Sequence, residues 1–169
     1  MPTLGSCVKD FAIPGLRILC NQATLYWMVM ARRGNPPSLE ELAQAGPIMQ
    51  GMKECGRPLT RSEFPDLLGR KGSILPGTVL MFYFRGNIAH SCIAKDSRTL
   101  GGFNQVGWLA GGGPNIYSEN NLTEIRWFGE NQVQGFPESK LCQLWAINEL
   151  GALQNLETLI AKNVNMAHA

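Results

Sequence analysis

The chain has 169 residues, of which 44% are hydrophobic and 17% are charged. This length suits one compact domain with a buried core, and the composition excludes a disordered acidic or basic tail protein. The 15 Lys and Arg residues nearly balance the 13 Asp and Glu residues, with no long run of like charge, so no surface for nucleic acid is indicated. We predict a single domain over residues 1–169.

The N-terminal part predicts irregular structure followed by a long helix. Residues 1–19 are interrupted by proline and glycine. Nothing interrupts a helix over residues 21–33, and the sequence Gly34-Asn35-Pro36-Pro37 ends it. Apolar residues recur there at helical spacing, so Cys20 is expected at or just before the first turn of a mostly buried helix.

Shorter helical segments follow the proline pair. Ser38 is a good N-cap, and Glu41 three residues later completes a capping box. The sequence therefore predicts helices over 38–45 and 47–55, with a weaker helical stretch at 60–68.

The second half of the chain predicts an antiparallel sheet, because β-branched and aromatic residues become frequent after Pro76. An amphipathic helix is expected over residues 149–163. Helices that are separate from an antiparallel sheet define the α+β class. The expected strands cover residues 78–84, 88–95, 99–108, 122–128 and 141–148, with a glycine-rich loop at 110–114.

The cysteine pattern argues against a domain held together by disulfides or by a bound metal. Five cysteines are scattered along the chain and no CxxC pair occurs, so neither a disulfide framework nor a structural zinc site is indicated. We predict no metal and no cofactor. We assign Cys7, Cys55, Cys92 and Cys142 to packing or incidental exposure.

One cysteine and one histidine stand out as candidates for chemistry. A helix N-terminus favours a thiolate, and Cys20 is expected there. The chain has two histidines. His168 is next to last, so His90 is the candidate for acid–base work at neutral pH. It would take the Cys20 proton and later protonate a leaving amine.

A polar residue on the next strand would orient the imidazole. His90, Cys92 and Ala94 share one face of the expected strand, because side chains alternate. A hairpin turn centred near residue 97 places Asn104 across from His90, and we favour Asn104. A shift of one residue would place Gln105 there instead, and Asp96 is a third option.

This order of residues resembles the papain-like cysteine hydrolase superfamily. The likeness covers roughly residues 18–108, and its small bacterial branches include NlpC-type and amidase-type peptidases and papain-fold toxins. It implies N-terminal helices packed on a central antiparallel sheet with a C-terminal helix, and a triad of Cys20, His90 and Asn104. The residues that carry it are Cys20 opening a helix, Pro76-Gly77-Thr78-Val79-Leu80-Met81-Phe82, Ala89-His90-Ser91-Cys92-Ile93-Ala94 and Gly101-Gly102-Phe103-Asn104-Gln105.

The chain departs from two patterns of these families. The Asp-Cys-Ser-Gly of the peptidoglycan-cleaving branch is replaced by Leu19-Cys20-Asn21-Gln22, and no glutamine stands several residues before Cys20. We therefore expect the Cys20 backbone N–H and the side chain of Asn21 or Gln22 to form the oxyanion hole, with Gln105 in support. Trp108 and the glycines at 111–113 are expected to wall the substrate cleft.

Taken with the resemblance, these residues predict a bacterial cysteine hydrolase that cleaves an amide bond. We expect a protease or a deamidase of a target protein, because Asp-Cys-Ser-Gly is missing. A peptidoglycan amidase or endopeptidase, with a peptidoglycan peptide as substrate, is one alternative. A non-catalytic papain-like adaptor domain is the other.

We expect the chain to be made in the bacterial cytoplasm, because no basic segment precedes an apolar one at its start. The likeness to toxins suggests delivery into a host or rival cell without a cleavable signal, with an immunity protein or a chaperone as possible partner. No apolar run approaches the 18 residues that a membrane helix needs, so we predict no membrane insertion.

Overall fold

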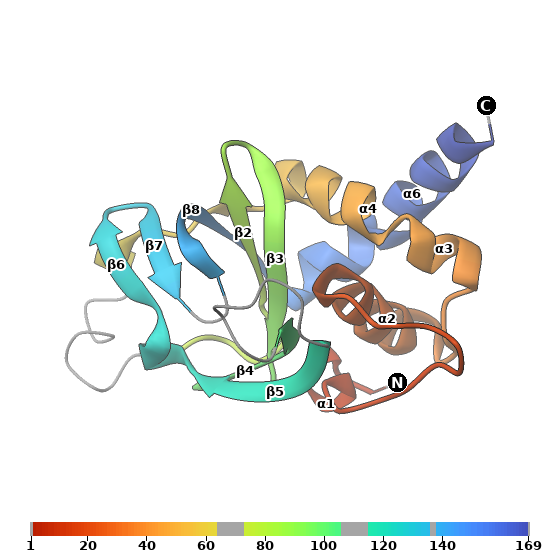
Figure 1. The fold of residues 1–169 in the computed structure, drawn as a ribbon, viewed down its shortest axis with the longest axis horizontal. Helices are drawn as coiled ribbons and strands as arrows, with labels where there is room; N and C mark the ends of the chain where they lie inside the picture. Colours follow the sequence, from red (N-terminus) through yellow and green to blue (C-terminus); the bar gives the residue numbers. More distant parts are fainter. Residues whose placement is uncertain (1, 64–72, 106–114, 136–137, 169) are drawn as a thin grey trace.

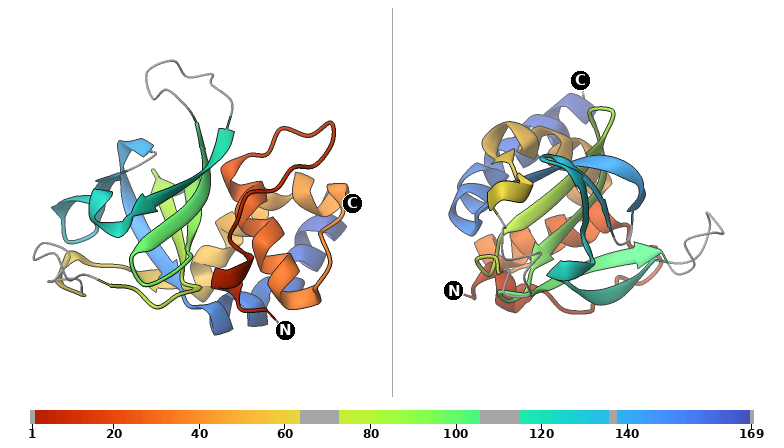
Figure 2. Two further views of the ribbon diagram at one scale, coloured as in Figure 1. Left: turned by 90° about the horizontal axis from the view of Figure 1, so that it is seen from below. Right: turned by 90° about the vertical axis from the view of Figure 1, so that its left-hand side faces the viewer.

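The computed structural model describes residues 2–63, 73–105, 115–135 and 138–168. The α+β class predicted from the sequence is confirmed: helices gather on one side of an antiparallel sheet that curls into a half-barrel (Figures 1 and 2). The helices are α1 (Leu4–Cys7), α2 (Cys20–Arg33), α3 (Leu39–Ala43), α4 (Ala45–Met52) and α6 (Glu149–Ala167).

Eight strands pair in the order β5-β4-β3-β2-β8-β7-β6, with β1 alongside β8, and every neighbouring pair is antiparallel. The chain therefore runs as a meander from β2 to β5 at one end of the strand order. It continues at the other end with β6 and runs back through β7 to β8, which pairs with β2. The strands are β1 (Arg57–Pro58), β2 (Val79–Phe84), β3 (Asn87–Ala94), β4 (Thr99–Gln105), β5 (Asn115–Asn121), β6 (Arg126–Gly129), β7 (Gln132–Gly135) and β8 (Glu138–Ile147).

The predicted helices are confirmed with small changes at their ends. Helix α2 begins at Cys20 and ends before Gly34, whose φ of 78° is the left-handed conformation that favours glycine. Ser38 caps α3, and the Glu41 side chain completes the capping box. The segment expected at 47–55 is α4 followed by one 3-10 turn, Lys53–Cys55.

The stretch expected to be helical at 60–68 lies outside the described residues from 64 onward, and its described part holds a 3-10 turn, Arg61–Glu63. Other predictions of local structure were wrong. The strand expected at 122–128 begins only at Arg126, because Asn121 caps a 3-10 turn at Leu122–Glu124. Strands β1, β5 and β7 were not predicted, because two are very short and β5 (Asn-Ile-Tyr-Ser-Glu-Asn-Asn) is mostly polar.

The sheet separates two hydrophobic cores. On one face, α2, α4 and α6 pack against alternate side chains such as Ile93 of β3. On the other, inner face, Cys92 and Ala94 of the same strand contribute to a second core with Leu80 and Phe82 of β2. The face that Cys92 and Ala94 share is the one that alternation predicted.

At its C-terminal end, α2 is joined to α3 and α6 by one arginine. Arg33 binds both oxygens of Glu41, at 2.9 and 2.8 Å, and both oxygens of Glu157, at 2.9 and 2.6 Å. This fork geometry needs a guanidinium. We expect Arg33→Lys to lower the free energy of unfolding by about 1 kcal/mol, a modest value because the three side chains are 17–43% exposed.

Urea unfolding of Arg33→Lys beside Arg32→Lys tests this expectation. Arg32 is exposed and precedes Arg33 in the same helical turn, so its replacement is the matched control. If both variants lowered the free energy of unfolding by the same amount, a specific role for Arg33 would be contradicted.

Candidate active site

Cys20 occupies the first helical position of α2, as the sequence predicted. The first intrahelical bond runs from the Ala23 N–H to the Leu19 carbonyl, at 3.0 Å, so the N–H groups of the first turn point out of the helix end. The first turn holds no acidic residue, and the Cys20 side chain is partly exposed. A helix end of this kind favours a thiolate.

The N-terminal turn of α2 is tied to β3 by hydrogen bonds from Ser91. The Ser91 hydroxyl lies 2.7 Å from Oδ1 of Asn21 and 2.9 Å from the hydroxyl of Thr24. Ser91 and Thr24 are completely buried. Because Cys20 precedes Asn21 and His90 precedes Ser91, these bonds bring the two predicted reactive residues into the same region.

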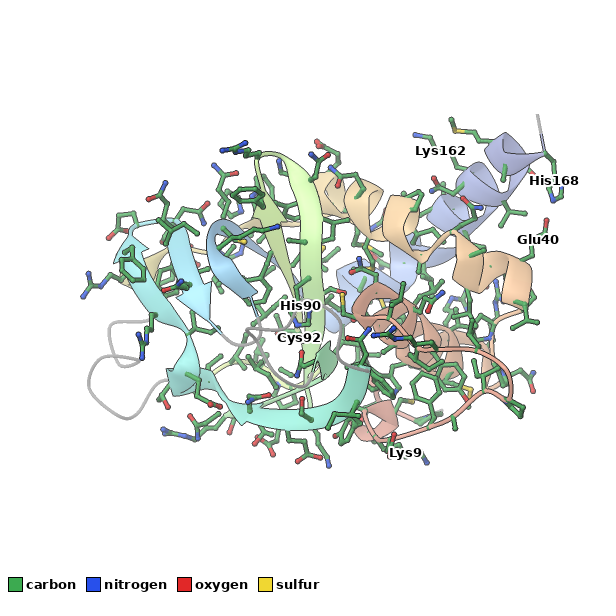
Figure 3. The ribbon with its side chains drawn as sticks, viewed as in Figure 1. Lys9, Glu40, His90, Cys92, Lys162 and His168 are labelled. Atoms are coloured by element: carbon green, nitrogen blue, oxygen red, sulfur yellow. The ribbon has the colours of Figure 1, made fainter. Side chains whose placement is uncertain are left out.

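His90 points to the face of β3 opposite Ser91. It is 3% exposed, and its ring lies 5.6 Å from the ring of Phe82 on β2. Figure 3 shows His90 and Cys92 close together on β3. Burial lowers the pKa of His90 to about 3, so the imidazole is neutral at neutral pH.

Cys92 is a packed thiol, consistent with its predicted role. Burial, followed by negative charge on Cys20, raises the pKa of Cys92 to about 12. The second cause means that Cys20 lies near enough to Cys92 for an electrostatic interaction.

The position of Asn104 follows from the β3–β4 hairpin. The pairs Ile93–Gly101 and Ala94–Leu100 centre this hairpin on Ser97, as predicted. The pairing ends at Ile93–Gly101, three residues before the pair of positions 90 and 104 that this register would give. Asn104 is 5% exposed.

The Asn104 side chain is held on its amino side only. Its Nδ2 donates to the Ser118 hydroxyl and, at 3.5 Å, to Oδ1 of Asn120. Its Oδ1 is buried and has no hydrogen-bond partner within the described ranges, so no bond joins it to His90. Gly102 leaves space beside this oxygen, because a Cβ there would lie 3.7 Å from Oδ1 and 3.2 Å from the Cβ of Cys92.

The other residues proposed for the site are placed as follows. Asp96 accepts the N–H groups of Arg98 and Thr99, at 2.9 and 2.8 Å, in the turn after β3. It is six residues from His90, about 20 Å along an extended strand, so the structure does not bring these two together. Oε1 of Gln22 accepts the Leu19 N–H at 2.9 Å, which is a capping contact. Gln105 ends β4, and its side chain lies outside the described part, as does Trp108 with the loop at 110–114.

A groove of about 460 Å³ lies elsewhere on the described part of the molecule, and neither Cys20, His90 nor Asn104 lines it. It is formed by the segment before α2 and by β4 and β5, and its lining residue Ile116 pairs with Asn104 in the sheet. A larger pocket, of about 650 Å³, lies near Cys55 and the start of α6 and shares no lining residue with the groove. The groove is lined by Asp10, Phe11, Ala12, Leu16, Arg17, Ile18, Phe103, Asn115, Ile116 and Tyr117.

The residues that support the site were not predicted from the sequence. Ser118 and Asn120, which hold Asn104, lie on β5, a strand that was not predicted. Ser91 and Thr24 carry the contact between α2 and β3, and the signal for them was present: Ser91 alternates with His90 and Thr24 lies one helical turn after Cys20.

The chain matches no protein-family model and no curated protein, and its fold matches no solved structure. Within the described ranges no helix is both long and apolar enough to cross a membrane. The same residues contain no group of three or more His, Cys, Asp or Glu side chains arranged to hold a metal ion.

Proposed function

We propose that this protein is a papain-like cysteine hydrolase of amide bonds, with Cys20 as nucleophile, His90 as acid and base, and Asn104 as the residue that orients His90. The observation that supports this function best is the buried Oδ1 of Asn104, which has no hydrogen-bond partner within the described residues and lies on β4, the strand that pairs with the strand of His90. An imidazole N–H of His90 is a suitable donor of a hydrogen bond to this oxygen.

The proposed reaction begins with attack by the Cys20 sulfur on the carbonyl carbon. His90 takes the thiol proton, the C–S bond forms, and the C=O electron pair moves onto oxygen. When the oxyanion collapses, the C–N bond breaks and His90 gives its proton to the departing amine. Water then hydrolyses the thioester, with His90 as base, and restores the thiol.

This chemistry is the same for a peptide bond and for the side-chain amide of Gln or Asn. We propose a target protein as substrate, in a host or rival cell, with peptidoglycan peptides as the alternative. Release of ammonia without chain cleavage identifies deamidation.

A non-catalytic adaptor is the second candidate. It is favoured by one observation: Ser91, not His90, is the residue of β3 that contacts the start of α2.

We predict that brief iodoacetamide exposure at pH 6 labels Cys20 at least about tenfold faster than Cys55, as a thiol beside a base should react. Cys55 is also partly exposed and serves as the internal control. In the His90→Gln variant, Cys20 should be labelled no faster than Cys55. Mass spectrometry of the labelled peptides over pH 5–9 measures both rates.

If both cysteines of the wild type react alike, with rates that rise only near pH 8.5, the catalytic pair is absent and the adaptor is supported. Tm values of the wild type and His90→Gln verify that both proteins are folded during labelling.

A further inference from the structure

The hydrogen bonds between α2 and β3 also determine how the Asn21 amide is turned. The amide oxygen of Asn21 cannot donate, so the 2.7 Å contact requires the Ser91 hydroxyl to donate to it. That uses the only proton of Ser91. The Thr24 hydroxyl lies 2.9 Å from the same Ser91 hydroxyl.

Ser91 thus joins Thr24 and Asn21, with Oδ1 of Asn21 as an acceptor. The first two residues are fully buried, whereas Asn21 is only partly buried. The oxygen of the Asn21 amide is thus held against β3, and its NH₂ group is the end left to donate elsewhere. Within the described residues no hydrogen bond of this NH₂ group is formed.

We infer that Asn21 donates its amide N–H to the oxyanion formed at Cys20, and that Ser91, with Thr24 behind it, is the positioning residue that turns the amide for this task. The inference rests on the proposed function.

Two features support Asn21 over Gln22. Asn21 follows Cys20 directly and is fixed to the strand that carries His90, so donor, thiol and base belong to one rigid frame. Gln22 also accepts through its amide oxygen, but its contact is exposed and joins it only to Leu19, three residues earlier. An oxyanion donor must be preorganised, because reorientation during the reaction would cost part of the stabilisation it supplies.

The test compares two reactions of the same thiol in the full-length protein. Acylation by p-nitrophenyl acetate passes through a tetrahedral oxyanion: the Cys20 sulfur bonds to the acetyl carbon and nitrophenolate leaves. Alkylation by iodoacetamide displaces iodide from an sp³ carbon and forms no oxyanion. Nitrophenolate release and intact mass report acylation, and peptide mass spectrometry reports alkylation.

We expect Asn21→Ala to slow acylation of Cys20 about 10²–10³-fold and to leave its alkylation unchanged. Ser91→Ala should slow acylation about tenfold, the equivalent of one lost hydrogen bond. Asn163→Ala, in which a helical asparagine bonded within α6 is replaced, is the control and should change neither reaction. Tm values confirm that each variant is folded.

Equal slowing of both reactions by Asn21→Ala would overturn the inference, because Asn21 would then only shape the helix end. A large loss of acylation in Gln22→Ala instead of Asn21→Ala would also overturn it. A wild type in which Cys20 is neither acylated nor alkylated faster than Cys55 would overturn the proposed function itself. Normal acylation in Asn21→Ala beside selective labelling of Cys20 would overturn this inference alone.

Discussion

Replacement of Gly101 by alanine should lower the free energy of unfolding by about 3 kcal/mol. Gly101 lies in the middle of β4, paired with Ile93 and Glu119. A Cβ at this position would overlap Cγ1 of Val8, which is 1% exposed in the core between α1 and the sheet. Because both the strand and the Val8 segment are packed, one of them has to move.

Urea unfolding monitored by tryptophan fluorescence measures this change. Gly129→Ala is the matched control, since Gly129 also lies in a strand but an added Cβ would meet only an ordinary contact, 3.8 Å from Cβ of Gln132. If Gly101→Ala were no more destabilising than Gly129→Ala, the packing of the N-terminal segment on β4 would be wrong.

The stability of the protein should fall as the pH is lowered from 6.5, and His90 should cause the fall. Burial lowers the pKa of His90 from 6.5 to about 3. Between these values the unfolded chain binds a proton that the folded protein does not bind. The contribution of neutral His90 is therefore fully present above pH 6.5 and is lost progressively below it, by roughly 1 to 2 kcal/mol for each pH unit.

Urea unfolding at pH 7.5, 6.5, 5.5 and 5.0 tests this pH dependence. His90→Gln, which cannot titrate, should show a much flatter profile in this window. His168→Gln is the control, because His168 lies exposed at the end of α6 beside Glu40 and is the other histidine of the chain. Identical profiles for wild type and His90→Gln would contradict the burial of a neutral imidazole. The window stays above the acid range in which Glu41, Glu63, Glu119 and Glu157, whose pKa values are lowered by ion pairs and hydrogen bonds, begin to take up protons.

The helices of this protein could be predicted well because their ends carry local signals. Glycine after Arg33 and the Ser38 capping box act within a few residues, so no distant contact is needed to recognise them. Strand β5 could not be recognised in this way. Its residues are polar and partly exposed, and they form a strand because β4 offers a complete ladder of partners from Thr99 to Gln105.

For the candidate site, too, the features that depend on local spacing were predicted, and the contacts between distant segments were not. Alternation along β3 and the centre of the β3–β4 hairpin were predicted from local spacing, and both are confirmed. The partners of the site residues were not predicted. Ser118 holds Asn104 from a strand that the sequence did not indicate, and Ser91 meets Asn21 across 70 positions of the chain.

By itself, therefore, the sequence determined the α+β class, the start of α2 at Cys20 and the face of β3 that His90 shares with Cys92. These features depend on backbone geometry and local capping, which act over a few residues. Only the tertiary structure decided that His90 is buried and neutral, that Oδ1 of Asn104 has no hydrogen-bond partner within the described residues and that Ser91 bonds to Asn21. Burial and hydrogen-bond completion depend on which distant segments come together, and that is a property of the whole packed chain.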